Sequence, residues 1–324
     1  MDSLKTILTF TPYYKTVVWG GDKIAALKGE KIDVERLGES WELSAVPGHE
    51  SVVDEGPFAG KNIVELCHTY GLRLLGTKVA KEFGDDFPLL IKLIDARENL
   101  SVQVHPDDEL ARVRHNSRGK TEMWYVVDCE KDANIYSGLS APLDPESYVR
   151  RVGDNTIMDV VGAHKSAPGQ FYFIPAGTIH AIGAGNLIAE IQETSDITYR
   201  VYDYDRRDAA GNPRQLHTVE ARDAIDYTFP KEVEPTAKIF DSTRMGAVEC
   251  SYFTTDFIEL KEGQKLDFIT TGESFTVLMV VGGEVEVRVG KETRCLTCGH
   301  TALIPAEAED LTLTGCGKVL RVTV

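Results

Sequence analysis

Short runs of apolar and β-branched residues, separated by glycine and proline turns, dominate the hydrophobic pattern of this chain. Residues 87–95 form a nearly continuous apolar run, which is typical of a buried strand. Residues 122–128 and 133–138 are rich in aromatic and β-branched residues, and residues 186–194 alternate between apolar and polar positions. We predict a strand in each segment, and hence a mainly β protein.

Helical spacing is confined to a few short segments. Residues 62–83 place apolar side chains at helical intervals, and Gly71 and Gly76 are expected to divide them into shorter helices. Residues 22–27 and 145–161 carry further short helical patterns. We expect the last of these to be a small helical insertion in a β framework.

The last third of the chain is again β-rich. Residues 226–237 are rich in proline and charge, so we expect a boundary there between domains spanning residues 1–235 and 236–324. Residues 276–289 are predicted to form two strands around a turn at Gly282 and Gly283, because paired glycines between apolar runs favour a hairpin.

Composition narrows the class of protein. A chain of 324 residues with a formal net charge of −16 lacks the excess of cationic side chains that a nucleic-acid or anionic membrane surface requires. It contains no apolar run approaching the ~20 residues of a membrane helix, and its first residues lack the features of a signal peptide. The six cysteines have no framework spacing, so we expect reduced thiols and a cytoplasmic protein; Cys295 and Cys298 form one CxxC pair, a weak zinc signal.

Candidate chemistry is concentrated in residues 99–125. Gln103 and His105 are two apart in an alternating run, which would direct both side chains to one face of a strand. The chain is expected to return along the next strand, which Glu122 opens, while His180 follows a Pro-x-Gly turn after another strand. Two imidazoles, a carboxylate and an amide oxygen suit a borderline divalent ion such as zinc.

Other polar residues share these faces. Ser101 precedes Gln103 by two positions, and Lys120 precedes Glu122 by two, so both pairs would project together. We expect Ser101 to contact a substrate hydroxyl or phosphate. Lys92, the one cation of the run 87–95, is expected to be a surface lysine that extends its amine to water.

Two sets of motifs resemble known families. Gly169-x5-Pro175-x-Gly177-x2-His180 resembles the second metal motif of cupin barrels. The segments LSVQVHPDDELA, KTEMWY, GTIHAIG and QETSDITYRVYDYDR resemble the type I mannose-6-phosphate isomerases, in their short bacterial form, over most of residues 12–207. The sequence Gly299-x5-Pro305 repeats part of the cupin motif but has Asp310 in place of the histidine, which predicts a second, degenerate barrel without a metal.

The resemblance implies a fold and a reaction. The fold would be mainly β, with a metal-binding jelly-roll barrel and a degenerate one. The reaction would be the zinc-dependent interconversion of mannose 6-phosphate and fructose 6-phosphate by a monomer or homodimer. Gln103, His105, Glu122 and His180 would bind one zinc ion. Arg200 would be the main catalytic residue, with Lys120 and Glu190 beside it; Arg200 and Lys120 would also contact substrate.

An aldose–ketose isomerase must stabilise an enediol or enediolate and move a proton between adjacent carbons. His105, Lys120 and Glu190 are all chemically suited to carry that proton, and the sequence leaves the choice open. A sugar phosphate would also need local positive charge in a chain of net charge −16. Two other functions remain as alternatives, an iron-dependent cupin oxygenase and a sugar-binding cupin without catalysis.

Overall fold

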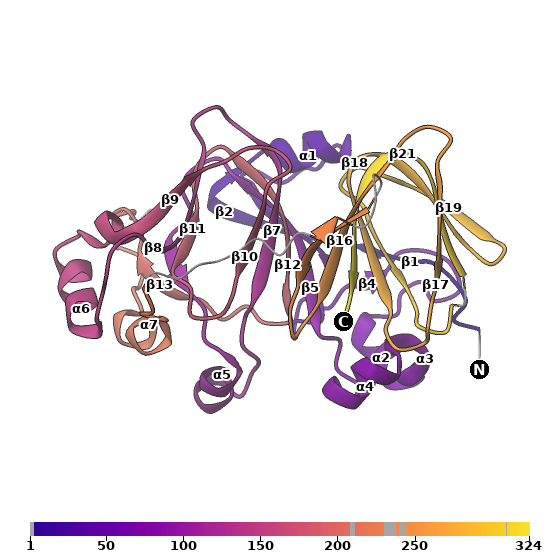
Figure 1. Cartoon of the computed structure of the whole chain (residues 1–324), viewed down its shortest axis with the longest axis horizontal. Coiled ribbons are helices and arrows are strands. Elements are labelled where there is room, and N and C mark those ends of the chain that lie inside the picture. The colour runs from indigo at the N-terminus through magenta and orange to yellow at the C-terminus, as the bar shows by residue number, and fades with distance from the viewer. Residues whose placement is uncertain (1–2, 208–210, 230–237, 240–243, 309) are drawn as a thin grey trace.

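The computed structural model describes residues 3–207, 211–229, 238–239, 244–308 and 310–324, and in this part strands predominate (Figure 1). They form three sheets, of ten, six and five strands. The mainly β architecture is confirmed. The proposed domain boundary falls partly on residues 230–237, which lie outside the described residues.

The six-stranded sheet is the centre of the molecule. Its order is β10-β7-β12-β5-β3-β2. The strands are β2 (Tyr13–Gly21), β3 (Leu37–Leu43), β5 (Leu89–Ala96), β7 (Glu122–Cys129), β10 (Phe171–Ile174) and β12 (Asn186–Glu193). On β5, Leu89, Ile91 and Leu93 enter the largest apolar cluster, whereas Lys92 and Ile94 on the other face line a cavity. Both faces are therefore buried, which explains the continuous apolar run.

The five-stranded sheet supplies Gln103, Ile182 and Arg200 to that cavity. Its order is β13-β6-β11-β8-β9. The strands are β6 (Val102–Val104), β8 (Asn134–Leu139), β9 (Val161–Lys165), β11 (His180–Ile182) and β13 (Tyr199–Tyr202). Gln103 on β6 lies opposite His180 on one side and Arg200 on the other. Residues paired in this way project from the same face, so the three side chains form one row.

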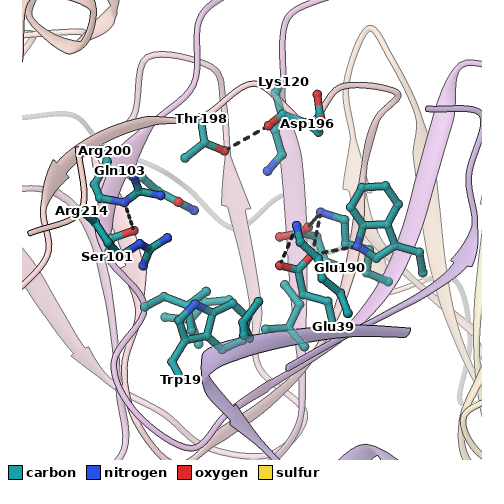
Figure 2. Close-up of a pocket in the computed structure, with 17 residues that line it drawn as sticks. Trp19, Glu39, Ser101, Gln103, Lys120, Glu190, Asp196, Thr198, Arg200 and Arg214 are labelled. Atoms are coloured by element: carbon teal, nitrogen blue, oxygen red, sulfur yellow. Dashed lines mark hydrogen bonds and ion pairs between the residues drawn. The ribbon is translucent and has the colours of Figure 1, made fainter. Parts of the chain in front are cut away.

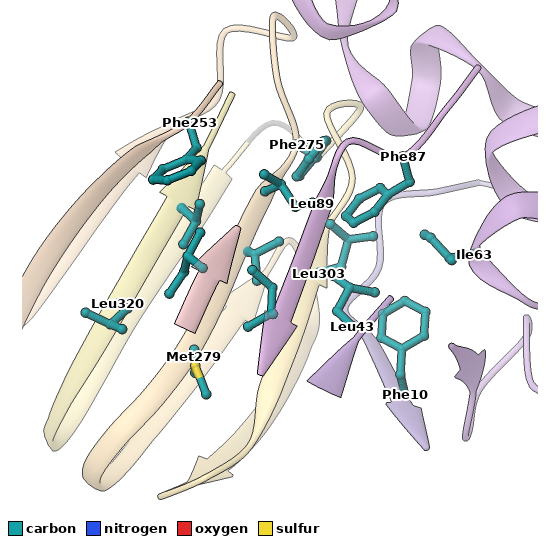
Figure 3. Close-up of a cluster of buried hydrophobic side chains, with 14 of the residues drawn as sticks. Phe10, Leu43, Ile63, Phe87, Leu89, Phe253, Phe275, Met279, Leu303 and Leu320 are labelled. Atoms are coloured by element: carbon teal, nitrogen blue, oxygen red, sulfur yellow. The ribbon is translucent and has the colours of Figure 1, made fainter. Parts of the chain in front are cut away.

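The ten-stranded sheet joins the two ends of the chain. It contains β14 (Lys238–Ile239), β15 (Arg244–Glu249), β16 (Thr254–Leu260), β17 (Lys265–Ile269), β18 (Thr276–Val289), β19 (Glu292–Thr297), β20 (Thr301–Ile304) and β21 (Asp310–Thr323), together with β1 (Leu8–Thr11) and β4 (Val52–Val53). Apolar residues of this sheet and of β5 belong to one cluster, as Figure 3 shows for Leu89, Phe275, Met279 and Leu320. The two halves of the molecule thus share a core.

The helices are short and lie around the sheets. They are α1 (Lys23–Lys28), α2 (Ile63–Tyr70), α3 (Leu72–Leu75), α4 (Thr77–Phe83), α5 (Asp108–His115), α6 (Pro145–Gly153) and α7 (Thr218–Ala224), with a 3-10 turn at Ile157–Val160. The predicted breaks at Gly71 and Gly76 are confirmed. The longest described helix has nine residues, too few to cross a bilayer.

One local prediction of secondary structure differs from the observed elements. Residues 276–289 form one strand, β18, instead of a hairpin, because Gly282 and Gly283 accompany a β-bulge while β18 remains paired with β21 on both sides of it. The turn comes at Gly290, between β18 and β19. In the connection between His105 and Glu122, the chain forms α5, which Asp107 caps by accepting a hydrogen bond from the Leu110 amide.

Candidate active site

Three buried side chains converge between the six-stranded and five-stranded sheets. His105 follows β6, Glu122 opens β7 and His180 opens β11. Their potential ligand atoms all lie within 4.8 Å of one another. His105 Nε2 is 3.5 Å from Glu122 Oε2, and His180 Nε2 is 3.3 Å from Glu122 Oε1. The structure therefore brings together residues that are up to 75 positions apart in the sequence.

Backbone carbonyls orient both imidazoles. His105 Nδ1 donates to the carbonyl of Ile197, and His180 Nδ1 donates to the carbonyl of Thr178, each over 2.8 Å. With the Nδ1 positions protonated, the Nε2 lone pairs are directed at Glu122. In metal sites, the ring nitrogen that does not bind the metal commonly donates a hydrogen bond of this kind, which fixes the orientation of the histidine.

The electrostatics of this group suit a cation. Burial lowers the pKa of His180 to about 4, and burial together with Lys120 lowers the pKa of His105 well below its ordinary value. Both rings are thus neutral at physiological pH, as metal ligands must be. Burial raises the pKa of Glu122 above its usual value, and neither of its buried oxygens accepts a hydrogen bond, although Lys120 Nζ lies 3.0 Å from Oε2. An unsatisfied carboxylate between two imidazole lone pairs fits a divalent ion.

Gln103 lies at the edge of this group. Its side-chain amide nitrogen is 3.3 Å from His180 Nε2. Rotating the amide by half a turn would exchange the nitrogen for the oxygen, the atom that binds a metal. His105, Glu122 and His180 form the only cluster of three or more candidate His, Cys, Asp or Glu ligands among the described residues.

A cavity of about 340 Å³ lies beside this group and has two distinct walls (Figure 2). On one wall, Arg200 Nε donates to Ser101 Oγ over 3.3 Å and Arg200 Nη1 donates to the carbonyl of Gln215 over 2.9 Å. Arg214 lies next to Arg200. Burial and the charge of Arg214 both lower the pKa of Arg200. Two cations thus face one end of the cavity.

The opposite wall is a row of paired residues across four strands. Glu190 on β12 lies opposite Trp124 on β7 and Lys92 on β5, and Lys92 lies opposite Trp41 on β3. Glu190 accepts from Lys92 Nζ over 3.0 Å and from Trp124 Nε1 over 2.8 Å. Burial opposes ionisation of Glu190, but Lys92 and Lys120 lower its pKa to about 2. Glu190 is therefore a buried carboxylate that stays charged.

The expectation of a surface Lys92 is wrong. Its side chain is 7% exposed and extends into the cavity, where its ammonium pairs with Glu190. Burial disfavours the charged amine, yet Glu190 and Glu39 together raise its pKa. A lysine on a strand that is buried on both faces cannot extend its amine to water. The continuous apolar run around Lys92 could therefore have predicted its burial.

Sequence analysis singled out none of four other charged residues of the cavity, Lys15, Glu39, Asp196 and Arg214. Glu39 Oε2 accepts from Trp41 Nε1 over 2.7 Å and lies 3.9 Å from Lys92 Nζ. Glu39 and Trp41 are two positions apart on β3, so both side chains project to one face of the strand. Arg214 comes from the segment before α7, where no pattern in the sequence pointed to a site.

Fold and site together define a cupin protein with a candidate metal centre. Two family models match the chain, the phosphomannose isomerase type I catalytic domain over residues 7–132 and the mannose-6-phosphate isomerase cupin domain over residues 243–324. Together they cover more than half of the 324 residues.

Relatives agree over nearly the whole length. The mannose-6-phosphate isomerase ManA of Bacillus subtilis is 35% identical over 97% of both chains, and the putative mannose-6-phosphate isomerase YvyI of the same organism is 35% identical over 94% of this chain and 95% of its own. A crystal structure of the mannose 6-phosphate isomerase from Bacillus subtilis matches with a TM-score of 0.88 and 32% identity, covering 98% of this chain and all of the other. The chain belongs to the type I mannose-6-phosphate isomerase family, and it is an enzyme of the isomerase class.

Proposed function

We propose that this enzyme interconverts mannose 6-phosphate and fructose 6-phosphate with the help of zinc. The observation that carries the proposal is one cavity with the His105, Glu122 and His180 group at its side and the Arg200 and Arg214 guanidiniums at one end. The relatives named above are mannose-6-phosphate isomerases by their own descriptions. We further propose that the enzyme acts in the cytoplasm, as a monomer or homodimer.

The charge of the cavity supports an anionic substrate. The chain as a whole has a formal net charge of −16, yet five cationic and only three anionic side chains line the cavity. Arg200, Arg214 and the Ser101 hydroxyl would bind the phosphate, because guanidinium groups match phosphate oxygens in pairs. The phosphate would then set the distance of the sugar carbonyl from the opposite wall.

His105, Glu122 and His180 would hold the zinc ion, with Gln103 as the fourth ligand. A bound zinc ion supplies Lewis-acid polarisation of the carbonyl and hydroxyl oxygens of the sugar. The Lys120 ammonium, 3.0 Å from Glu122 and 3.2 Å from His105 Nε2, adds positive charge at the place where negative charge develops on oxygen in an enediolate.

Lys120 and Glu190 are the two groups best placed to carry the proton between C1 and C2 of the sugar. Both are buried side chains that line the cavity. Lys92 holds Glu190 in a fixed position by a hydrogen bond of 3.0 Å, and Lys92 also donates to Gln192 over 2.7 Å. Replacing Lys120 by Met and Glu190 by Gln, each measured by exchange of the C2 hydrogen with solvent, would identify the carrier as the variant that loses exchange while retaining sugar binding.

The proposal is tested by measuring conversion of mannose 6-phosphate by the protein as purified, after treatment with a chelator, and after zinc is restored. We expect activity to be lost with the metal and to return with zinc. A zinc-loaded protein that binds the sugar phosphate without converting it would support the non-catalytic cupin instead. Oxygen consumption restored by iron would support the oxygenase.

A further inference from the structure

The segment from Gly119 to Thr121 carries Lys120 into the site and leads directly to Glu122. Its backbone is held against the start of α5. The Gly119 amide donates to Asp108 Oδ1 over 2.8 Å, and the Lys120 amide donates to the carbonyl of Pro106 over 3.1 Å. A Cβ atom on Gly119 would lie 2.6 Å from the Asp108 amide nitrogen, so this close approach requires glycine. The Asp108 carboxylate therefore locates the peptide between Arg118 and Gly119, one residue before Lys120.

The second oxygen of Asp108 is held by the other half of the molecule. Tyr252, in the turn between β15 and β16 of the ten-stranded sheet, donates its hydroxyl to Asp108 Oδ2 over 3.0 Å. These two residues are 144 positions apart. A hydrogen bond to an ionised carboxylate is stronger than one between neutral groups. The carboxylate of Asp108 thus bridges a C-terminal turn and the backbone of the active-site segment.

The turn that presents Tyr252 is itself well anchored. The Cys250 amide donates to the carbonyl of Phe253 over 3.0 Å, which closes the turn. The Phe253 side chain is 1% exposed and inserts into the apolar cluster that the two halves share, which also contains Leu320 of β21 (Figure 3). The Tyr252 ring packs against the same cluster. Packing of the ring therefore fixes the position of the Tyr252 hydroxyl.

A further buried acidic side chain holds the same segment from the opposite strand. Glu193, at the end of β12 and 3% exposed, accepts from the Thr121 amide over 2.7 Å, and the Glu193 amide donates to the carbonyl of Thr121 over 3.2 Å. Both ends of the segment from Gly119 to Thr121 are therefore tied to acidic side chains. The hydrogen bond from Tyr252 connects the Asp108 end to the turn between β15 and β16.

We propose that Tyr252 is a positioning residue for the isomerisation, acting through Asp108 and the Gly119 amide to hold Lys120 in place beside Glu122. This inference rests on the proposed function, in which Lys120 acts on the reacting sugar. It gives a part in the chemistry to the C-terminal half, whose described residues, 244–308 and 310–324, contribute no lining residue to the cavity beside the metal group.

The test compares zinc-loaded wild type with Tyr252→Phe, which removes the hydroxyl and retains the ring. We expect kcat to fall roughly 3- to 10-fold with little change in KM, less than the full effect of a hydrogen bond to a charged group, because Tyr252 acts on Lys120 only indirectly. Zinc content is expected to stay at the wild-type level. Tyr172→Phe is the matched control, because it also loses one tyrosine hydroxyl hydrogen bond, here to Gln170 on the surface, and should retain wild-type kcat.

Asp108→Ala gives an independent check of the route. In that background Tyr252→Phe should cause no further loss of kcat, because Tyr252 acts only through the carboxylate. The positioning role would be overturned if the kcat losses of the two single variants multiplied in the double variant. It would also be overturned by an unchanged kcat in Tyr252→Phe, or by a fall in kcat proportional to a loss of zinc. A zinc-loaded wild type that fails to isomerise mannose 6-phosphate would instead overturn the proposed function.

Discussion

At the scale of single residues, Arg200 is the clearest test of the cavity. Its guanidinium donates hydrogen bonds to the Ser101 hydroxyl and the Gln215 carbonyl, neither of which is a candidate metal ligand. We expect Arg200→Ala to lose most turnover, by about 10²-fold or more, because a charge that orients a bound phosphate is removed. Zinc content measured by mass spectrometry should be unchanged. Arg150→Ala, an exposed arginine on α6, serves as the control, and loss of zinc from Arg200→Ala would contradict the assignment.

Glu193 makes a prediction about pH and stability. Burial raises its pKa to about 8, with Asp108 contributing in the same direction, from an ordinary value of 4.5. The folded protein therefore holds the proton of the Glu193 carboxyl group more tightly than the unfolded chain does. The stability that this protonated side chain contributes is fully present below about pH 4.5 and is lost as the pH rises through about 8.

Glu193→Gln retains an oxygen to accept from the Thr121 amide but cannot ionise. We therefore expect the difference in Tm between Glu193→Gln and wild type to increase in favour of the variant between pH 5 and pH 9. Thermal unfolding over that range measures it. A difference that does not depend on pH would show that Glu193 titrates in the folded protein as it does in water.

At the scale of elements, β18 and β21 approach each other closely at Gly283, next to the bulge in β18. Gly283 has φ 68°, and a Cβ atom there would lie 2.3 Å from the Cys316 carbonyl oxygen on β21. Gly263, in the turn after β16, has φ 78° and open space around it. Both glycines have a positive φ, but only Gly263 has free space where a Cβ atom would lie.

We accordingly expect Gly263→Ala to reduce the free energy of unfolding by about 1 kcal/mol, the cost of the left-handed conformation alone. Gly283→Ala should cost roughly 2–4 kcal/mol, because overpacking adds to that cost. Denaturant titration of both variants gives the comparison. Equal losses would mean that the strands separate at the bulge without penalty.

At the scale of the whole molecule, the shared core predicts that the two halves unfold together. Phe275 of the C-terminal half contacts Phe87 of the N-terminal half, with ring centroids 4.9 Å apart. All three tryptophans, at positions 19, 41 and 124, lie in the N-terminal half and provide its fluorescence signal.

Phe275→Ala should therefore move the unfolding transition seen by tryptophan fluorescence, by about 3–5 kcal/mol, although it removes no contact of a tryptophan that the structure records. Ile269→Ala, which truncates a C-terminal side chain that is 85% exposed, should leave the transition in place. A tryptophan transition unmoved by Phe275→Ala would mean that the halves unfold separately.

The strands at residues 87–95, 122–128, 133–138 and 186–194, the helix breaks and the residues of the candidate metal group were predicted from local signals in the sequence. Alternation placed Gln103 and Ser101 on one face, and the Pro-x-Gly turn placed His180 directly after it, where the structure begins β11. Local signals failed where one stretch of sequence is compatible with two backbone conformations of similar local energy. Paired glycines suit both a hairpin and a bulge, and only the continuous partner strand β21 selects the bulge, which lies between Val280 and Gly282.

The sequence by itself determined the β framework, the family and the polar residues carried by its motifs, because these depend on the spacing of residues along one strand or turn. The tertiary structure alone decided which separate strands face each other. It turned Lys92 inward against Glu190, added Arg214 beside Arg200, and linked Tyr252 to Asp108. These pairs are remote in sequence, so their electrostatic and hydrogen-bond energies arise only when the sheets pack, and no local pattern records them.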